Sequence, residues 1–462
     1  MQKNETVTLE ITGMTNEGNG VGRAEGMAVF VPLTAVGDII KCKIVKVNKS
    51  YCFGIIESII TPSQYRCEPL CEVFAKCGGC AFRHFTYEEE LRVKLDFVRA
   101  SFERIGKLPL FPDTILGAES TSRYRNKAQY PVTMLDGRVV CGFYSRRSHR
   151  VVPCDDCALQ PEVFARITKC ITDYANKKHI PAYNELDNTG LLRHIYLRRG
   201  ENSGEIMLCL AVTSKSSAGA LEELCDILIH RFPMIKSIVL NINPKNTNAI
   251  LGKEFITLRG SDTITDIMCG RRISLSPASF YQVNTLQAQK LYGIAAEYAK
   301  LEENDILLDL YCGTGTIGLA LAGEGIKLIG ADIVPSSIEN ARSNARANGV
   351  NAEFVCADAA KAAQLFYSRG ERPNVIVADP ARKGCDRQTL EYMAKMSPDR
   401  IVMISCDHST AARDIAFLRE LGYELTKAQA VDLFPRTAHV ECISLLTRSE
   451  QPFCENHRSA AV

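Results

Sequence analysis

The segment Ile306-Leu-Leu-Asp309-Leu-Tyr-Cys-Gly313-Thr-Gly315-Thr-Ile-Gly318 decides the fold of the C-terminal part of the chain. An apolar run passes directly into a glycine-rich turn of the form G-x-G-x-x-G, as happens where a buried strand leads into a helix N-terminus that binds a ligand. Further apolar runs, separated by helical sequence, begin at Lys327, Glu353, Asn374 and Ile401. This alternation predicts a doubly wound parallel sheet over residues 281–447, with ligands bound at the carboxyl ends of its strands.

Carboxylates mark the ends of these predicted strands. Asp309 lies at the approach to the turn, where it would repel a pyrophosphate but suit the cationic end of S-adenosylmethionine. Asp332 ends the next strand, about 20 positions further on, a spacing suited to ribose hydroxyls. Asp358 ends the third strand, where an adenine amino group would lie, and Asp379 ends the fourth. The pattern favours an adenosyl cofactor over a dinucleotide, although Asp332 or Asp358 alone is equally consistent with a strand-end cap.

Cys406 is the candidate nucleophile. It follows the apolar run Ile401-Val-Met-Ile-Ser405 and precedes Asp407-His-Ser-Thr, which opens a predicted helix. Uracil C5 is too weak a nucleophile to take a methyl group unaided, so a thiolate must first add at C6. Unpaired amides at a helix N-terminus stabilise negative charge, so this position favours the thiolate form. Taken singly, Cys406 is also consistent with a buried core thiol.

Glu441 is the candidate base for removing the proton from C5. It belongs to Phe434-Pro-Arg-Thr-Ala-His439-Val-Glu441-Cys442, a turn that enters the last apolar strand, Ile443-Ser-Leu-Leu. A carboxylate at the entrance of an apolar strand is unusual, because burying a charge is costly. A capped or paired carboxylate is the structural alternative, and His408 and His439 are rival bases.

The first 60 residues contain about five short apolar strands separated by turn residues, among them Val7-Thr-Leu-Glu-Ile-Thr and Met27-Ala-Val-Phe-Val. This count predicts an OB-like β-barrel over residues 1–60, a shape often used on single-stranded RNA. A barrel that only packs on its neighbour is the alternative.

Residues 61–280 are predicted to form an α+β middle domain, in which a helix near 218–231 separates two of the strands. An amphipathic helix is expected over 87–105, because Leu91, Leu95, Val98 and Phe102 share one face. We expect this helix to pack on the C-terminal domain.

Three cysteines with short spacing, Cys71-x5-Cys77-Gly-Gly-Cys80, lie on a predicted loop of the middle domain. Three sulfur ligands need a fourth, and Cys157 is the expected partner, with Cys154 and Cys67 as alternatives. Four cysteines hold either zinc or an iron-sulfur cluster, and spacing alone does not choose between them. His84, close behind Cys80, is predicted to be a surface residue.

Cations and aromatic residues alternate between residues 123 and 150. Cations follow phosphates and aromatic rings stack on bases, so the sequence places the RNA path here, with a solvated basic face as the alternative. The members of this segment are Arg123, Tyr124, Arg125, Lys127, Tyr130, Arg138, Phe143, Tyr144, Arg146, Arg147 and Arg150.

The composition limits how RNA could be bound and where the protein could be located. The formal net charge of +2 gives no global sign of nucleic-acid binding, so an RNA surface must be local. Without a signal peptide or an apolar span, the chain is expected to be cytoplasmic, where its 19 cysteines serve as buried thiols, ligands or a nucleophile. The polar tail over 448–462 is expected to be disordered, and the protein to be a monomer.

Five motifs occur in order along the chain and resemble those of the bacterial RNA 5-methyluridine (uracil-C5) methyltransferases. They are Ser279-Phe-Tyr-Gln282-Val-Asn284, Asp309-Leu-Tyr-Cys-Gly-Thr-Gly315, Asp379-Pro-Ala-Arg-Lys-Gly384, Ser405-Cys406 and Phe434-Pro-Arg-Thr-Ala-His-Val-Glu441. The likeness spans nearly the whole chain and includes an N-terminal TRAM domain. It implies an α/β enzyme with a Rossmann-like class I methyltransferase domain.

The resemblance also implies residue roles. Cys406 would be the nucleophile and Glu441 the proton acceptor. The residues expected to contact the cofactor or the uracil are Gln282, Tyr311, Asp332 and Asp379, with Thr316 and Asp358 as further cofactor contacts. Cys71, Cys77, Cys80 and Cys157 would hold a 4Fe-4S cluster, because the ribosomal RNA members of the family use this spacing. For the same reason the expected substrate is 23S rRNA.

One departure from the family is visible, and several other functions remain open. The family usually has Asn-Pro after the nucleophile, whereas this chain has Asp407-His408, and a carboxylate there would raise the pKa of the thiol. A tRNA substrate is the nearest alternative. Methylation of cytosine C5 or of an exocyclic amine fits Glu441 and Gln282 less well. A non-catalytic RNA-binding ribosome-assembly factor and an NAD-dependent iron-sulfur redox protein are the other classes.

Overall fold

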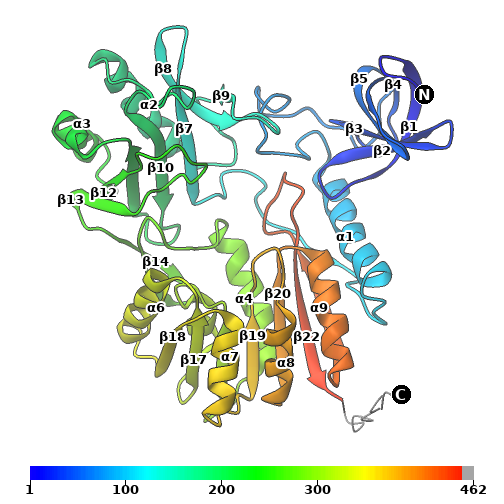
Figure 1. Cartoon of the computed structure of the whole chain (residues 1–462), viewed down its shortest axis with the longest axis vertical. Helices are drawn as coiled ribbons and strands as arrows, with labels where there is room; N and C mark the ends of the chain where they lie inside the picture. Colours follow the sequence, from blue (N-terminus) through cyan, green and yellow to red (C-terminus); the bar gives the residue numbers. More distant parts are fainter. Residues whose placement is uncertain (450–462) are drawn as a thin grey trace, which may run out of the picture.

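A barrel, a seven-stranded sheet and an eight-stranded sheet make up residues 1–449, which are the residues that the computed structural model describes. In Figure 1 the barrel and the seven-stranded sheet occupy the two upper corners, and the eight-stranded sheet lies below them. The tail predicted for 448–462 therefore falls, except for its first two residues, outside the described part of the chain. No helix among residues 1–449 is long and apolar enough to cross a membrane.

The N-terminal strands close into the expected barrel, in the order β1-β2-β3-β5-β4. Alternate residues of each strand point inward, so Leu9, Ile11, Val29 and Val31 form part of a small buried core. The strands are β1 (Thr6–Met14), β2 (Asn19–Ala24), β3 (Met27–Pro32), β4 (Ile39–Val47) and β5 (Tyr51–Thr61).

The middle sheet has the order β13-β12-β11-β10-β7-β8-β9, and two helices pack into one core with it. The helix predicted near 218–231 is present as α3 (Ala218–Arg231) between β11 and β12, and a second helix that was not predicted, α2 (Glu162–Lys177), precedes β10. The strands are β7 (Lys127–Leu135), β8 (Arg138–Tyr144), β9 (Val151–Pro153), β10 (Leu192–Arg199), β11 (Ile206–Val212), β12 (Ile235–Ile242) and β13 (Glu254–Gly260), and a short 3-10 turn, η1 (Lys215–Ser217), precedes α3.

The C-terminal sheet has the order β18-β17-β16-β19-β20-β22-β21-β6, and its first five strands are parallel. The predicted α/β class is confirmed. Its strands are β16 (Ile306–Leu310), β17 (Lys327–Asp332), β18 (Ala352–Cys356), β19 (Val375–Ala378), β20 (Arg400–Ser405), β21 (Tyr423–Val431), β22 (Glu441–Arg448) and the short β6 (Ile115–Leu116).

Helices cover both faces of this sheet, because its strands are apolar on both sides. On β16, for example, Leu307 faces one core and Leu308 the other. The first face is covered by α4 (Thr285–Ala299), α5 (Thr316–Leu321) and α6 (Pro335–Ala347), and the second by α7 (Ala359–Ser368), α8 (Arg387–Lys395) and α9 (His408–Glu420).

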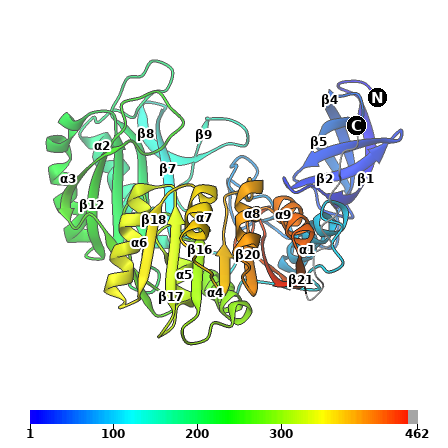
Figure 2. The same ribbon diagram turned by 60° about the horizontal axis from the view of Figure 1, so that its bottom comes forward.

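Segments from earlier in the chain complete the C-terminal unit. The predicted amphipathic helix is present as α1 (Tyr87–Arg104), whose Val98 and Phe102 enter the same core as α9. Figure 2 shows α1 beside α9, with the barrel beyond them. The hairpin of β14 (Ile264–Met268) and β15 (Arg271–Leu275) packs into the core on the opposite face. α1 and the β14–β15 hairpin, which both precede the C-terminal domain in the sequence, therefore pack on the two opposite faces of its sheet.

Candidate active site

A cleft of about 760 Å³ lies between the barrel, the loop over 78–81 and the carboxyl edge of the C-terminal sheet. Cys406 lines it, at the junction between β20 and α9. The barrel contributes residues of β4 and β5, and the connection between β21 and β22 contributes residues 437–440. The candidate nucleophile is thus accessible from a space bounded by all three units of the molecule.

Glu441 lies next to Cys406 because of the strand register. β20 and β22 are antiparallel, and Ser405 is paired with Cys442. The next positions outward on the two strands are Cys406 and Glu441, so both residues leave the sheet at the same edge. Glu441 is only 3% exposed, and its Oε2 has no hydrogen-bond partner within residues 1–449. A buried carboxyl oxygen without a partner beside a thiol fits a group that handles a proton.

Burial and nearby charges shift the ionisation of both the thiol and the carboxyl group. Burial raises the pKa of Cys406 to about 11, with the negative charges of Glu441 and Asp379 adding to the rise and Arg382 opposing it. The expected preference for the thiolate is therefore wrong for the protein without bound RNA. Burial likewise raises the pKa of Glu441 well above its ordinary value, and burial raises that of Asp379 to about 7.

The unusual Asp407-His408 pair serves the start of α9. Asp407 caps the helix, since its Oδ1 accepts hydrogen bonds from the backbone N–H of Ser409 (2.9 Å) and of Thr410 (3.1 Å). Its carboxylate is not among the groups that raise the thiol pKa. His408 Nδ1 lies 2.7 Å from the Ser101 hydroxyl of α1, and burial lowers its pKa. A ring held in this way is a poor rival to Glu441.

Arg382 is a candidate site residue that the sequence reasoning missed, although it lies within the quoted motif Asp379-Pro-Ala-Arg382. It lines the cleft with Cys406, and its Nη2 lies 3.0 Å from His439 Nε2. Burial, followed by the charge of Arg382, lowers the pKa of His439 to about 4, which makes His439 a weak base. The sequence did contain a signal for Arg382: it follows Asp379 by three residues, on the loop at the carboxyl end of a buried strand.

The predicted cofactor turn has the geometry that a close ligand needs. Asp309 is fully buried, its Oδ2 accepts a hydrogen bond from Gly318 N (2.8 Å), and its Oδ1 has no partner among the described residues. Burial raises its pKa to about 8. A Cβ added to Gly318 would lie 2.8 Å from Asp309 Oδ2, whereas one added to Gly313 would meet only open space. The turn is therefore closely packed at Gly318, next to Asp309, and has free space at Gly313, where a ligand can approach the backbone.

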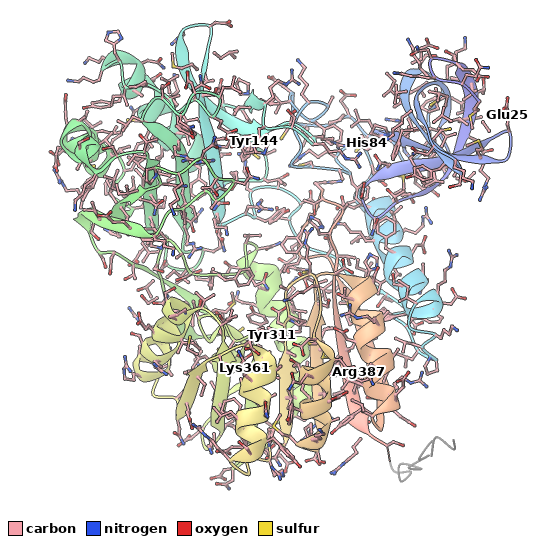
Figure 3. All side chains as sticks on the ribbon, in the orientation of Figure 1. Glu25, His84, Tyr144, Tyr311, Lys361 and Arg387 are labelled. Carbon is pink, nitrogen blue, oxygen red and sulfur yellow. The ribbon has the colours of Figure 1, made fainter. Side chains whose placement is uncertain are left out.

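The other predicted cofactor contacts occupy the same edge. Asp332 accepts hydrogen bonds from Gly313 N (3.1 Å) and Val334 N (2.8 Å), which connects the ends of β16 and β17. Tyr311 adopts a left-handed backbone with φ of 66°. In Figure 3, Tyr311 and Lys361 lie at the upper end of the C-terminal sheet. Asp358 caps α7 by accepting from Lys361 N (3.0 Å). Asp332 and Asp358 thus fill capping roles, and their contacts with a cofactor stay predictions.

Thr316 and Gln282 are both buried beside this edge. The Thr316 hydroxyl lies 3.0 Å from that of Thr314 in the first turn of α5. The main-chain carbonyl of Gln282 accepts a hydrogen bond from Asn126 Nδ2 (2.8 Å), which fixes the segment before α4. Phe280, two residues earlier, is 61% exposed, an unusual state for a phenyl ring.

The predicted cysteine site is a cavity of about 290 Å³ in the middle domain. It is lined by Cys71, Cys77, Cys80, Cys154 and Cys157. Cys67 lies elsewhere and donates a hydrogen bond to Phe85 O (2.8 Å). Within residues 1–449 no group of three or more His, Cys, Asp or Glu side chains is placed to hold a single metal ion.

Positive charge accompanies these thiols. Arg83 lies beside the cavity, is 6% exposed and has a buried Nη2 without a partner within the described residues. Burial raises the pKa of Cys80 to about 11 and also raises that of Cys77, while the charges of Arg83 and Arg146 oppose the rise. The pKa of Cys157 is lowered to about 6, first by a hydrogen bond from Cys154 and to a smaller extent by Arg83. Such a cavity suits a negatively charged group held by sulfur.

The prediction that His84 is a surface residue was wrong. It is 3% exposed, and its Nε2 lies 3.0 Å from Thr34 O of the barrel. Figure 3 shows it between the barrel and the middle domain. Its ring packs between Phe74 and Phe85, and burial lowers its pKa to about 4. His84 therefore joins the cysteine loop to the barrel as a neutral side chain.

Much of the segment predicted as the RNA path is unavailable to RNA. Tyr124 and Tyr130 are buried at 8% and 2% exposure, and Arg123 Nη2 is paired with Asp156 Oδ2 at 2.6 Å. Arg146 and Arg147 do line the cleft that contains Cys406. Arg147 is itself paired with Glu17 (2.7 Å). Arg138 and Arg150 of the segment are exposed outside the cleft, so only part of the predicted basic face lies on the rim of this cleft.

Comparisons with known proteins agree with this picture. Residues 268–449 match the family model described as tRNA (Uracil-5-)-methyltransferase, and residues 1–56 match that of the TRAM domain. The chain is 40% identical over 448 residues to a protein of Clostridium tetani named an uncharacterized RNA methyltransferase, covering 97% of both chains. A protein of Halalkalibacterium halodurans with a similar name is 40% identical over 448 residues, covering 96% of this chain and 98% of the relative.

A solved structure shares the fold over nearly the full length. The Pyrococcus abyssi tRNA (uracil-54, C5)-methyltransferase, in complex with S-adenosyl-L-homocysteine, superposes with a TM-score of 0.77. The alignment covers 96% of this chain and 100% of that one, at 24% sequence identity.

Proposed function

Since the chain belongs to the family of S-adenosylmethionine-dependent RNA (uracil-5-)-methyltransferases, we propose that Cys406 and Glu441 carry out methylation of C5 of a uridine in RNA. The observation that carries this proposal is the placement of the two side chains. They stand on adjacent strands at the edge of the sheet, and Cys406 faces a cleft large enough to receive a base that has left its stack.

The first step is addition of the Cys406 sulfur to C6 of the uracil, which forms the S–C6 bond and moves an electron pair toward C5 and O4. The thiol must lose its proton first, and water in the cleft can take it; burial raises the pKa of the thiol to about 11, so this proton transfer accompanies the attack. Arg382 is the nearby cation that lowers this pKa, and it offers positive charge for the developing enolate.

The second role belongs to Glu441. Once C5 carries the methyl group, its proton must leave, and the returning electron pair expels the sulfur from C6 and restores the ring. A carboxylate whose pKa is raised by burial is a stronger base than an exposed one, and this suits proton removal near neutral pH.

S-adenosylmethionine, when bound, supplies the methyl group. The turn over 313–318 and the carboxyl groups of Asp309 and Asp332 would hold it, because they combine a close backbone approach with negative charge for a cationic ligand. Gln282, Tyr311, Thr316, Asp358 and Asp379 complete the proposed set of contacts. Ile333, beside Asp332, is 66% exposed and offers an apolar surface to a planar ring.

We assign a 4Fe-4S cluster to the cavity lined by Cys71, Cys77, Cys80 and Cys157. In a cubane each thiolate binds a different iron, so its ligands surround a volume instead of meeting at one point. The thiols do surround a cavity of about 290 Å³, and Arg83, whose Nη2 has no partner within the described residues, supplies the positive charge that such a cluster calls for. The methylation described above needs no electron, so the cluster is structural or in contact with RNA.

The cleft indicates how RNA would be held. Lys46, Arg146 and Arg147 on its rim can follow phosphates, while Phe53 of the barrel offers a ring for stacking. All these groups and the reacting pair belong to one chain, so a monomer is sufficient. We favour 23S rRNA as the substrate, because the barrel and the cysteine set occur together here as in the ribosomal members of the family. A tRNA is the second candidate, favoured by the description of the matching family model.

The test is to map 5-methyluridine by mass spectrometry in 23S rRNA and tRNA from a strain lacking the gene, before and after restoring it. We expect one 23S rRNA position to lose and regain the methyl group. Loss in tRNA alone would replace the rRNA assignment. No change in either RNA, together with no tritium release from C5-labelled uridine RNA, would support the non-catalytic RNA-binding alternative.

A further inference from the structure

The connection over 432–440, which joins β21 to β22, positions the proposed base. It contributes residues 437–440 to the cleft and ends directly at Glu441. A nine-residue connection between neighbouring antiparallel strands is longer than a tight hairpin, so its shape depends on outside contacts. Those contacts come from α1 and from the cysteine loop.

The first contact is a buried ionic cluster at the start of the connection. Lys94 of α1 is fully buried, and its Nζ donates to Glu90 Oε1 (2.7 Å), Asp432 Oδ1 (2.8 Å) and Phe434 O (3.2 Å). The Tyr87 hydroxyl donates to Asp432 Oδ2 (2.8 Å). A fully buried cation with three acceptors fixes the direction in which the connection leaves β21.

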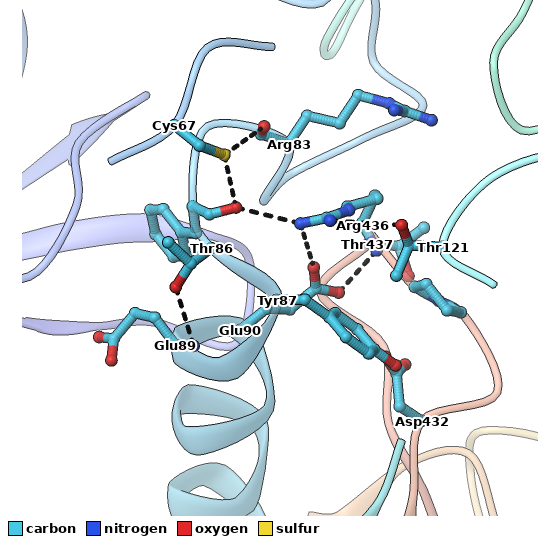
Figure 4. Close-up of polar contacts among 12 residues, drawn as sticks. Cys67, Arg83, Thr86, Tyr87, Glu89, Glu90, Thr121, Asp432, Arg436 and Thr437 are labelled. Atoms are coloured by element: carbon cyan, nitrogen blue, oxygen red, sulfur yellow. Dashed lines mark hydrogen bonds and ion pairs between the residues drawn. The ribbon is translucent and has the colours of Figure 1, made fainter. Parts of the chain in front are cut away.

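The second contact is Arg436, in the middle of the connection. Its backbone N–H donates to Glu90 Oε1 (2.6 Å), and its guanidinium donates to Phe85 O (3.0 Å) and lies 3.4 Å from Glu90 Oε2. Figure 4 shows the Arg436 side chain turned toward Glu90, and Tyr87 turned toward Asp432. Arg436 has a φ of 70°, a strained conformation for a long side chain that persists only where neighbours hold it.

The third contact reaches the cysteine loop. The carbonyl of Arg436 accepts hydrogen bonds from the backbone N–H groups of Ala81 (2.9 Å) and Phe82 (3.1 Å), the two residues that follow Cys80. On the other side, Arg146 Nη2 donates to Cys80 O (2.7 Å). One short run of chain therefore touches both the cavity of the cysteines and the segment that carries Glu441.

We propose that Lys94 and Arg436 are positioning residues for Glu441, and that the cysteine loop acts on catalysis through the Arg436 carbonyl. This inference rests on the proposed function, and it assigns the loop to one step. Proton removal from C5 requires Glu441 to be correctly placed, whereas attack of Cys406 on C6 does not. Loosening the connection should therefore slow the release of product and leave formation of the covalent adduct unchanged.

The experiment compares two substrates. On RNA with 5-fluorouridine at the target, fluorine replaces the proton, so the rate of covalent trapping reports attack and methyl transfer alone. On ordinary RNA, turnover also needs Glu441. For Lys94→Met and Arg436→Met we expect trapping within about 2-fold of the unaltered protein, turnover lowered by about 10- to 100-fold, and accumulation of covalent complex on ordinary RNA. Arg104→Met changes an exposed cation in the last turn of the same helix and should alter neither rate.

Two further variants guard against simple loss of folding and test the loop itself. Lys94→Met combined with Asp432→Asn leaves fewer unpaired buried charges and should show the same split between the two rates. Cys80→Ala should lose iron and also show the split. Equal losses of trapping and turnover in these variants would overturn the inference while leaving the proposed function intact. Failure of the unaltered protein both to trap and to methylate would instead refute the proposed function.

Discussion

The two cysteine sites of this protein differ in the charges around them. The five thiols of the middle-domain cavity lie beside Arg83 and Arg146, and they lie beside one another. Cys406 stands at the sheet edge with Glu441 and Asp379, whose charges add to the rise that burial causes in its pKa, whereas the charge of Arg382 opposes it. Cysteine thus suits a permanent role as a ligand in the middle-domain cavity and a transient role as a nucleophile at position 406.

Burial raises the pKa of the thiol in both regions, to about 11 for Cys406 and to about 11 for Cys80. The difference lies in the charges that come next. Carboxylates add to the rise at Cys406, whereas the charge of Arg83 opposes it at Cys80. A permanent thiolate in an open cleft would be exposed to oxidation and to adventitious metals, so a protonated resting sulfur suits Cys406.

The largest effect is expected for Cys406→Ala. Without the sulfur no bond to C6 can form, so both methylation and trapping on 5-fluorouridine RNA should fall below detection. Cys67→Ser, at an exposed cysteine outside both sites, should retain both activities. Methylation at the normal rate by Cys406→Ala would remove the basis for assigning the nucleophile.

Glu441→Gln should have the next largest effect. Loss of the base should lower turnover by about 10²- to 10⁴-fold, and the covalent complex should accumulate on ordinary RNA because the sulfur cannot leave. Gel mobility of labelled RNA under denaturing conditions measures this complex. Glu424→Gln, at an exposed position of β21, serves as the matched control. If Glu441→Gln reduced trapping and turnover equally, the carboxyl group would act on Cys406 instead of on C5.

The sequence predicted those features of the fold and of the candidate site that depend on local residue patterns. Apolar runs bounded by carboxylates identified the parallel sheet, because strands buried on both faces have few other compositions. They also identified Asp332 and Asp358 at its edge. The missed helix α2 carried a usable signal, since Phe164, Ile167 and Ile171 recur at helical spacing and are buried.

The parts that were wrong depend on distant partners. The helix N-terminus beside Cys406 suggested a thiolate, but burial outweighs it, and the charges of Glu441 and Asp379 add to the rise in pKa. Tyr124 and Tyr130 fitted a base-stacking surface, yet the fold turns them inward. His84 follows a polar loop, but Thr34 of the barrel covers it. Neither the direction of a side chain nor the charge opposite it can be read from neighbours in the sequence.

The ligand set of the cavity can be tested with the pair Cys157→Ala and Cys154→Ala. Both thiols line the cavity, and the proposal assigns Cys157 as the fourth ligand. We expect Cys157→Ala to lose most of its iron and acid-labile sulfide, and Cys154→Ala to keep them, when the proteins are prepared without oxygen. The reverse pattern would exchange the two cysteines, and stoichiometric zinc without iron in the unaltered protein would contradict the cluster.

Asp309→Asn should have the smallest and most specific effect, since Asn keeps an oxygen for the Gly318 N–H and removes only the ionisable group that we propose faces the cofactor. Burial raises the pKa of Asp309 to about 8, whereas an unfolded chain has an Asp pKa of about 3.9. Between these values the native state holds more protons than the unfolded state, so this residue lowers stability as pH rises toward 8.

The Asn variant removes that pH-dependent loss, so its Tm should exceed that of the unaltered protein at pH 8.5 and differ less at pH 5. Its affinity for S-adenosylmethionine, measured by calorimetry, should fall because a cationic ligand loses its buried counter-charge. Asp399→Asn, at a half-exposed carboxylate paired with Arg448, should change neither quantity appreciably. Unchanged cofactor affinity in Asp309→Asn would mean that the buried carboxyl group only holds the glycine turn through Gly318.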